Sequence, residues 1–170
     1  AQSETIHFGG GVGTPKATEL IAQNYDKYKY FFRAGPLNGL GRGREQVRWV
    51  SNAAEDLGWS NVAVITEDFL WTEPVHDALV NDLPNEADVE ISMETRVSSE
   101  TEDYTPVLQY AESQNVDAVL VAIAHLGTTL ISQWADYQPD FPLAGINSLA
   151  SDPAFYNNVG GKSEYLTFST

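Results

Sequence analysis

The feature that most constrains the fold is a run of apolar, mostly β-branched residues from Val62 to Thr66. A strand with almost no polar residue is buried on both faces, which is typical of parallel sheets covered by helices on either side. Two further runs, 118–123 and 142–146, have the same character. The first run is followed at once by Glu67, Asp68, Phe69, Leu70 and Trp71. Because open α/β sheets bind ligands at the carboxyl ends of their strands, this pattern predicts a small-molecule cleft at one sheet edge.

Strand and helix patterns alternate along the rest of the chain. Strands are predicted at 5–8, 28–33, 62–66, 89–93, 118–123, 142–146 and 165–168, and helices at 15–24, 41–57, 73–83, 104–111 and 126–137, with a helical turn at 153–156. The longest helix repeats its apolar residues every three or four positions and ends at Gly58. The helix at 73–83 is expected to stop at Pro84. This order predicts an α/β fold with a doubly wound, mainly parallel sheet.

Length and composition limit the class of protein. The 170 residues fit one domain, and an apolar content of 42% supports a packed core. No run of 18 apolar residues occurs, so no membrane span is predicted. Cysteine is absent, which excludes disulfides, thiol catalysis and thiolate metal sites. Strands are predicted close to both ends with no helix to cover them, so we expect a segment cut from a longer protein. No signal-peptide pattern opens the chain, so we expect that any such peptide is already removed or was never in this segment.

The net charge of −15 arises from 24 acidic residues against nine basic ones. Such a field repels nucleic-acid phosphates and anionic lipid, so neither is expected as a partner. Either a cationic partner or adaptation to high salt would explain the acidity, and we favour the halophilic explanation. Seven of the nine basic residues lie between Lys16 and Arg48.

The glycine-rich segment from Gly9 to Thr14 follows a predicted strand and precedes a predicted helix. That is the position of a phosphate-binding loop, but Thr14 and Pro15 stand where a Walker loop needs Lys and Ser or Thr. The spacing of a dinucleotide-binding loop is missing as well. Two interpretations remain: backbone N–H groups that contact a smaller anion or carboxylate, or a flexible turn.

Catalytic and metal sites find little support. Glu67 and Asp68 could hold Mg²⁺ as in phosphoacceptor domains, but the further acid and the lysine that such a site needs are missing, and solvated loop acids explain the pair as well. No serine lies in a nucleophile elbow. His7, His76 and His125 are too scattered for a metal cluster, and His76 is expected on the surface of a helix. We therefore expect no enzyme activity, no metal and no cofactor.

Three polar-tipped side chains instead follow three successive core strands, namely Trp71, His125 and Asn147. Because parallel strands end at the same sheet edge, these side chains are expected to converge on one hollow. Aromatic walls with a few hydrogen-bonding groups are typical of a binding pocket rather than of a catalytic site.

The order of several segments resembles that of type I periplasmic solute-binding proteins, in the branch of ABC transporter receptors for branched-chain amino acids and amides. The matching segments are GTPKATEL (13–20), YKYFFRAGP (28–36), LGWSNVAVI (57–65), EDYTPVL (102–108), NVDAVLV (115–121) and PLAGINSL (142–149). No single motif is specific, so the resemblance rests on their order and spacing over nearly the whole chain.

The resemblance implies a two-lobed receptor of which this chain is the middle part. Residues 1–27 would end the first lobe and carry the ligand loop and its helix, residues 28–36 would form a hinge strand, and residues 37–170 would form the second lobe. It also implies a set of ligand-binding residues, namely Gly11, Gly13, Thr14, Trp71, Ala124, His125 and Asn147. A free copy of this segment would expose its cleft face and could self-associate through it.

The resemblance further implies an extracytoplasmic protein, in the periplasm or as a cell-surface lipoprotein, that captures a small polar solute and delivers it to an ABC permease. Amino-acid receptors of this family place an acid at the position of Asn147 to pair with the ligand ammonium, and asparagine carries no charge. We therefore expect an amide, a carboxylate or another neutral-headed solute rather than a standard amino acid. Two alternatives stay open: a ligand-sensing regulatory domain of the same fold, and a Mg²⁺-dependent phosphoacceptor or enzyme using Glu67 and Asp68.

Overall fold

The computed structural model describes residues 4–35, 37–164 and 166–169, and its main body is a five-stranded, wholly parallel sheet. The strand order is β4-β3-β5-β6-β7. The strands are β3 (Asn61–Glu67), β4 (Glu90–Val97), β5 (Ala118–Ile123), β6 (Leu143–Asn147) and β7 (Thr167–Ser169). This sheet confirms the predicted α/β, doubly wound, parallel fold. Tyr165, predicted to begin the last strand, lies outside the described residues.

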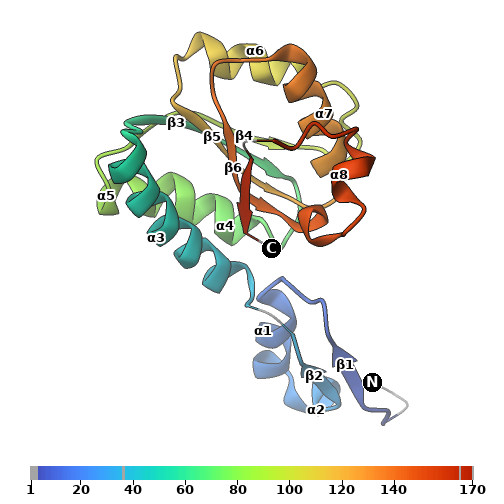
Figure 1. The fold of residues 1–170 in the computed structure, drawn as a ribbon. Coiled ribbons are helices and arrows are strands. Elements are labelled where there is room, and N and C mark those ends of the chain that lie inside the picture. The colour runs from blue at the N-terminus through green and yellow to red at the C-terminus, as the bar shows by residue number, and fades with distance from the viewer. Residues whose placement is uncertain (1–3, 36, 165, 170) are drawn as a thin grey trace.

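Helices cover both faces of the sheet (Figure 1). One face carries α3 (Gly39–Leu57), α4 (Glu73–Asp77), the π-helical segment η1 (Ala78–Asp82) and α5 (Leu83–Glu86). The other carries α6 (Thr105–Ser113), α7 (Gly127–Tyr137), the 3₁₀ turn η2 (Ser148–Ser151) and α8 (Phe155–Asn158). No helix within the described ranges is long and apolar enough to cross a membrane.

The alternation of side chains along β3 produces two separate hydrophobic cores. Val62 and Val64 pack against α3 and the helices that follow β3, whereas Ala63 and Ile65 pack against α6 and α7. All six residues of β5 are buried. Apolar side chains are therefore needed on both sides of these strands, which is why the sequence shows continuous rather than alternating apolar runs.

The first part of the chain forms a small unit with little core of its own. Its strands β1 (His7–Gly9) and β2 (Phe31–Arg33) pair in parallel as a separate two-stranded sheet. Its helices α1 (Lys16–Gln23) and α2 (Tyr25–Tyr28) contain no buried residue. Phe8 and Phe32 are 67% and 48% exposed. In Figure 1 this unit projects from the main body beyond the start of α3.

Two element starts differ from the sequence prediction because of asparagine caps. α3 begins at Gly39 rather than at residue 41, since the Asn38 side chain accepts the backbone N–H of Gly41 at 3.1 Å. Asn24, predicted as the last residue of a helix, is the C-cap of α1, and its side chain also caps the short helix α2 by accepting the N–H of Lys27 at 3.2 Å. This extra turn delays β2 to Phe31. Asparagine favours such caps because its side-chain oxygen replaces a missing backbone acceptor.

Pro84 does not stop its helix as predicted. It lies within α5, and the turn before it is widened to a π-helix whose closing bond runs from the Leu83 N–H to the Ala78 oxygen. The wider turn gives room to the proline ring, which in a regular helix would clash with the carbonyl four residues earlier. β4 likewise continues to Val97, four residues past its predicted end, although Glu94, Thr95 and Arg96 are polar, because it is an edge strand.

Asp117 fixes the start of β5 against the start of β3. Its Oδ2 accepts the backbone N–H groups of Ser60 at 2.7 Å and Asn61 at 2.9 Å, and the Ser60 hydroxyl lies at 3.2 Å. These hydrogen bonds, the two backbone ones first, hold the pKa of the Asp117 carboxyl below its usual value. The side chain thus sets the register of two strands that lie far apart in the sequence.

Asp117→Asn is expected to lower the unfolding free energy by about 1 kcal/mol at neutral pH, because charge-assisted bonds to two N–H groups become weaker. The folded carboxyl has the lower pKa, so its contribution is present above the unfolded value near 3.8 and is lost as the pH falls through the folded value. Urea titrations at several pH values measure this. Asp140→Asn removes the same charge from an exposed position and serves as the control. Equal losses in both variants would contradict a specific role for Asp117.

Candidate functional site

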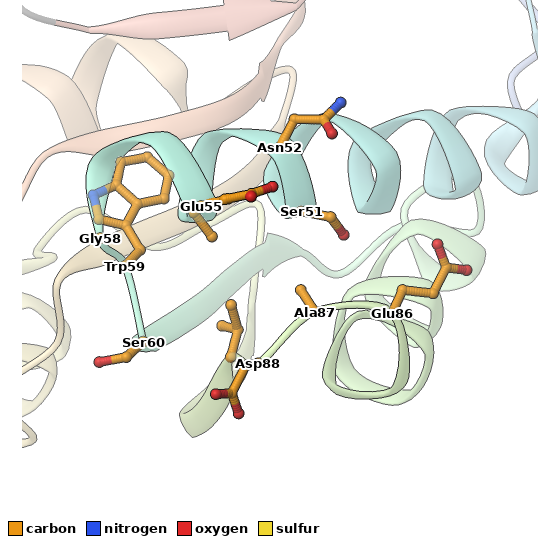
Figure 2. Close-up of a pocket in the computed structure, with 11 residues that line it drawn as sticks. Ser51, Asn52, Glu55, Gly58, Trp59, Ser60, Glu86, Ala87 and Asp88 are labelled. Carbon is orange, nitrogen blue, oxygen red and sulfur yellow. The ribbon is translucent and has the colours of Figure 1, made fainter.

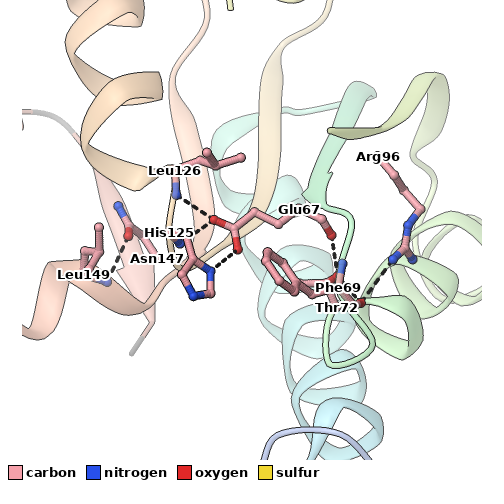
Figure 3. Close-up of polar contacts among 8 residues, drawn as sticks. All are labelled: Glu67, Phe69, Thr72, Arg96, His125, Leu126, Asn147 and Leu149. Atoms are coloured by element: carbon pink, nitrogen blue, oxygen red, sulfur yellow. Dashed lines mark hydrogen bonds and ion pairs between the residues drawn. The ribbon is translucent and has the colours of Figure 1, made fainter. Parts of the chain in front are cut away.

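The loop that follows β3 is held in place by Thr72. The buried Thr72 hydroxyl lies 2.5 Å from the Glu67 carbonyl oxygen and 2.8 Å from that of Phe69, between which its single hydrogen is shared. On the outer side, Arg96 of β4 lies 2.9 Å from Asp68 and donates to the Phe69 carbonyl at 3.1 Å. These contacts fix the backbone of the loop that carries Phe69, Leu70 and Trp71 at the carboxyl edge of the sheet, and Figure 3 shows those made by Thr72 and Arg96 with Phe69.

The predicted ligand loop meets Trp71. A Cβ added to Gly13 would lie 3.1 Å from the Trp71 Cβ, so this glycine permits the close approach. The Gly13 carbonyl also accepts the N–H of Gly39, at the start of α3, at 2.8 Å. The Thr14 hydroxyl accepts the N–H of Lys16 at 3.3 Å and borders, with Leu70 and Glu73, a hollow of about 260 Å³. Gly11 has open space where a side chain would be.

Glu67 is fully buried at the end of β3 and binds the turn after β5. Its Oε1 accepts the backbone N–H groups of His125 at 2.5 Å and Leu126 at 2.7 Å. Its Oε2 lies 3.2 Å from Nδ1 of the His125 ring. Because α7 begins at Gly127, this carboxylate lies at the amino end of that helix, where negative charge is favoured. Figure 3 shows these three contacts.

His125 combines a fixed backbone with an accessible ring. Its side chain is 63% exposed, and the ring packs on Phe69 with 4.7 Å between centroids. The ring borders a hollow of about 790 Å³ whose other lining residues are Ser99, Glu100, Thr101, Glu102, Leu126 and Thr129. An aromatic neighbour and several polar groups therefore surround one solvent-facing imidazole. Ala124, just before it, is partly exposed.

Asn147 has a different environment from His125. Its side chain is fully buried, and its Oδ1 accepts the N–H of Leu149 at 3.1 Å. A Cβ on Gly127 would collide with the Asn147 amide, so the two residues are in close contact. Nδ2 has no hydrogen-bond partner among the described residues. The position therefore offers one unused N–H₂ group beneath the start of α7, and no negative charge.

Trp71, His125 and Asn147 do lie at one edge of the sheet, because β3, β5 and β6 are adjacent and parallel. They do not share one hollow as predicted, because the His125 ring faces a hollow that neither Trp71 nor Asn147 lines, and Asn147 is buried against Gly127. The contacts link Gly13 to Trp71, and Glu67 and Phe69 to His125. Sequence reasoning missed Phe69 as the neighbour of His125. Its place at a strand end beside Trp71 was the available signal.

The structure does not place Glu67 and Asp68 together as ligands for a Mg²⁺ ion. Glu67 accepts backbone N–H groups and Asp68 pairs with Arg96, so the two carboxylates do not share a site. In the described part of the chain, no group of three or more His, Cys, Asp or Glu side chains is placed to hold a metal.

Two titratable groups lie in or near the core. His76, expected on the surface, is 12% exposed, and its Nδ1 lies 3.1 Å from the Thr66 hydroxyl. Burial lowers the pKa of His76, although nearby Glu94 acts in the opposite direction. Tyr104 is fully buried and its Oη has no partner within the described ranges. Burial, and next the charge of Glu67, raise the pKa of the Tyr104 phenol well above its ordinary value. Neither group reaches the hollow beside His125.

A second hollow, of about 530 Å³, lies at the opposite edge of the sheet, next to the amino ends of β3 and β4. Its lining includes Glu55 near the end of α3, Trp59 just after that helix, Glu86 at the end of α5 and Asp88 after it, as Figure 2 shows. Because it lies at the amino ends of parallel strands, it is on the side where such sheets do not usually bind ligands.

No protein-family model and no curated protein matches this sequence. Solved structures do match its fold. A protein described as a branched-chain amino acid ABC transporter from Silicibacter pomeroyi is 18% identical, with a TM-score of 0.73 over 98% of this chain and 43% of its own. A branched-chain amino acid ABC transporter protein from Thermus thermophilus with bound valine is 16% identical, with a TM-score of 0.66 over 97% of this chain and 40% of its own.

A solute-binding protein of an ABC transporter from R. palustris, solved with benzoate, is 15% identical, with a TM-score of 0.66 over 81% of this chain and 37% of its own. The chain thus spans less than half the length of these structures. At this level of identity the likeness establishes the fold, which is that of a lobe of type I periplasmic binding proteins, as the sequence resemblance predicted.

Proposed function

We propose that this chain, which has the fold of ABC transporter solute-binding proteins, is part of such a receptor. The receptor closes two lobes on a small polar solute outside the cytoplasm and delivers it to a membrane permease. The observation that carries this proposal is the pairing of aromatic and polar groups at one sheet edge: Trp71 against Gly13, and Phe69 against the exposed His125 ring. Binding and release need no catalytic group, and the proposal includes none.

The division of the fold supports a place in the middle of a two-lobed protein. In this proposal residues 1–27 end the first lobe, 28–36 form a hinge strand and 37–170 form the second lobe. The separate sheet of β1 and β2, with its exposed Phe8 and Phe32 rings, agrees with a first lobe whose remainder lies elsewhere in the protein. The match to less than half of each neighbour's length agrees as well.

The proposed ligand set consists of Gly11, Gly13, Thr14, Trp71, Ala124, His125 and Asn147. The Asn147 amide carries no negative charge, so it cannot form an ion pair with an ammonium group, and its Nδ2 is buried without a partner among the described residues. We infer an amide, a carboxylate or a neutral-headed solute rather than a standard amino acid. Calorimetry of the parent protein with leucine, valine, benzoate and benzamide tests this. Tight binding of leucine would refute the ligand class.

Trp71→Ala is expected to weaken the binding of whichever of these solutes binds by about tenfold or more, because a large aromatic contact is lost. Calorimetry of the parent protein measures the change. Trp59→Ala is the matched control, since it removes the same side chain from the opposite edge of the sheet (Figure 2) and should leave the affinity unchanged. Equal effects of the two substitutions would argue against a contact between Trp71 and the solute.

A further inference from the structure

We propose that Glu67 is a positioning residue that fixes the tautomer of the His125 ring. The proton is held on Nδ1, and the unprotonated Nε2 is presented to the solute as a hydrogen-bond acceptor. The part of the solute that meets His125 then carries an N–H or O–H donor. The inference rests on the proposed function for the solute, but the state of the ring is independent of any ligand.

The Glu67 carboxylate has hydrogen-bond contacts at both of its oxygens. Oε1 already accepts two backbone N–H groups, from His125 and Leu126. Oε2 is therefore the oxygen left for the imidazole, and its distance to Nδ1 is 3.2 Å. A carboxylate oxygen only accepts hydrogen bonds, so Nδ1 must be the protonated nitrogen of this pair.

The other nitrogen of the His125 ring, Nε2, is the one that faces away from Glu67. A neutral imidazole carries one N–H, so protonation at Nδ1 leaves Nε2 as an acceptor. Nε2 lies on the side of the ring away from Glu67 (Figure 3), and the side chain is 63% exposed. The Nδ1 contact with Glu67 and the packing on Phe69 limit rotation of the ring out of this pose.

The hollow beside the His125 ring is lined mostly by polar residues. Glu100 and Glu102 line it together with the hydroxyls of Ser99, Thr101 and Thr129. Carboxylates accept hydrogen bonds and repel anions, and the chain as a whole carries a net charge of −15. The unprotonated Nε2 adds one more hydrogen-bond acceptor to a hollow that already contains the Glu100 and Glu102 carboxylates. The amide form of a solute therefore fits this end better than its carboxylate form.

The test reads the His125 tautomer by ¹⁵N NMR of the ligand-free chain at pH 8. The expected wild-type result is a protonated Nδ1 and a bare Nε2. In Glu67→Gln the amide oxygen accepts the two backbone N–H groups, and the amide N–H₂ donates to Nδ1. The proton is then expected at Nε2. Asp68→Asn removes the neighbouring acid, which pairs with Arg96, and should leave the tautomer unchanged.

A wild-type ring protonated at Nε2 overturns the positioning role, even if Glu67→Gln fails to fold. A purely structural role for Glu67 would change stability in the variant without moving the proton. Calorimetry of the parent protein with benzamide and benzoate at pH 8 then tests the solute. Benzamide is expected to bind about tenfold tighter or more, and Glu67→Gln to remove that preference. Tighter benzoate binding, or no binding of either, overturns the donor assignment while leaving the measured tautomer intact.

Discussion

Gly145→Ala should unfold this protein or lower its unfolding free energy by about 4 kcal/mol or more, a large part of the stability of a typical domain. Gly145 lies in the middle of β6 with a φ of +122°, a region that residues with a Cβ rarely adopt. A Cβ there would collide with the Val121 carbonyl oxygen and lie 3.0 Å from the Val121 nitrogen. Both atoms belong to the backbone of β5, which is buried on both faces and has nowhere to move.

Gly160→Ala is the control that separates the cost of a positive φ from the cost of the collision with the β5 backbone. Gly160 has a φ of +62°, and no atom lies within 4 Å of an added Cβ. Only the left-handed backbone opposes alanine there, at a cost of about 1–2 kcal/mol. Urea titrations followed by circular dichroism measure both variants. A Gly145→Ala protein as stable as Gly160→Ala would show that β5 and β6 are not packed as closely as the structure has them.

Leu120→Ala should lower the unfolding free energy by about 3–4 kcal/mol, the usual cost of a cavity in a rigid core. Leu120 is fully buried in the middle of β5. It packs in the core formed with α3, where its neighbours include Val64 and Val50. β5 is hydrogen-bonded to β3 on one side and to β6 on the other, so its backbone cannot shift to close the space left by the missing side chain.

Leu57→Ala removes the same atoms from a leucine that is 63% exposed at the end of α3. Its effect should stay within about 0.5 kcal/mol. Denaturant titrations with an unchanged slope give the difference directly. A loss below about 1 kcal/mol for Leu120→Ala would mean that the core between the sheet and α3 is loosely packed.

The glycine and asparagine positions show where local sequence was informative and where it was not. Gly58, expected to end the longest helix, does so with a left-handed φ of +73° and its N–H on the Ala54 oxygen. Asn24 was assigned to the end of a helix, and it caps the next one. Asn24 serves both helix ends at once, because its N–H reaches the Leu20 oxygen of α1 while its side chain accepts the Lys27 N–H of α2, so the residue type alone does not show that a second helix begins there.

The sequence by itself determined the buried strands and their order, because burial on both faces demands continuous apolar runs that are visible without coordinates. It also predicted that the residues following β3, β5 and β6 lie at one edge of the sheet, since parallel strands end together. Only the tertiary structure decided which polar groups at that edge remain available. Glu67 meets the turn at His125 across 58 positions, and Asn147 is buried behind Gly127. The physical reason is that a polar group's exposure depends on donors and acceptors brought to it by crossover connections, and no local pattern records them.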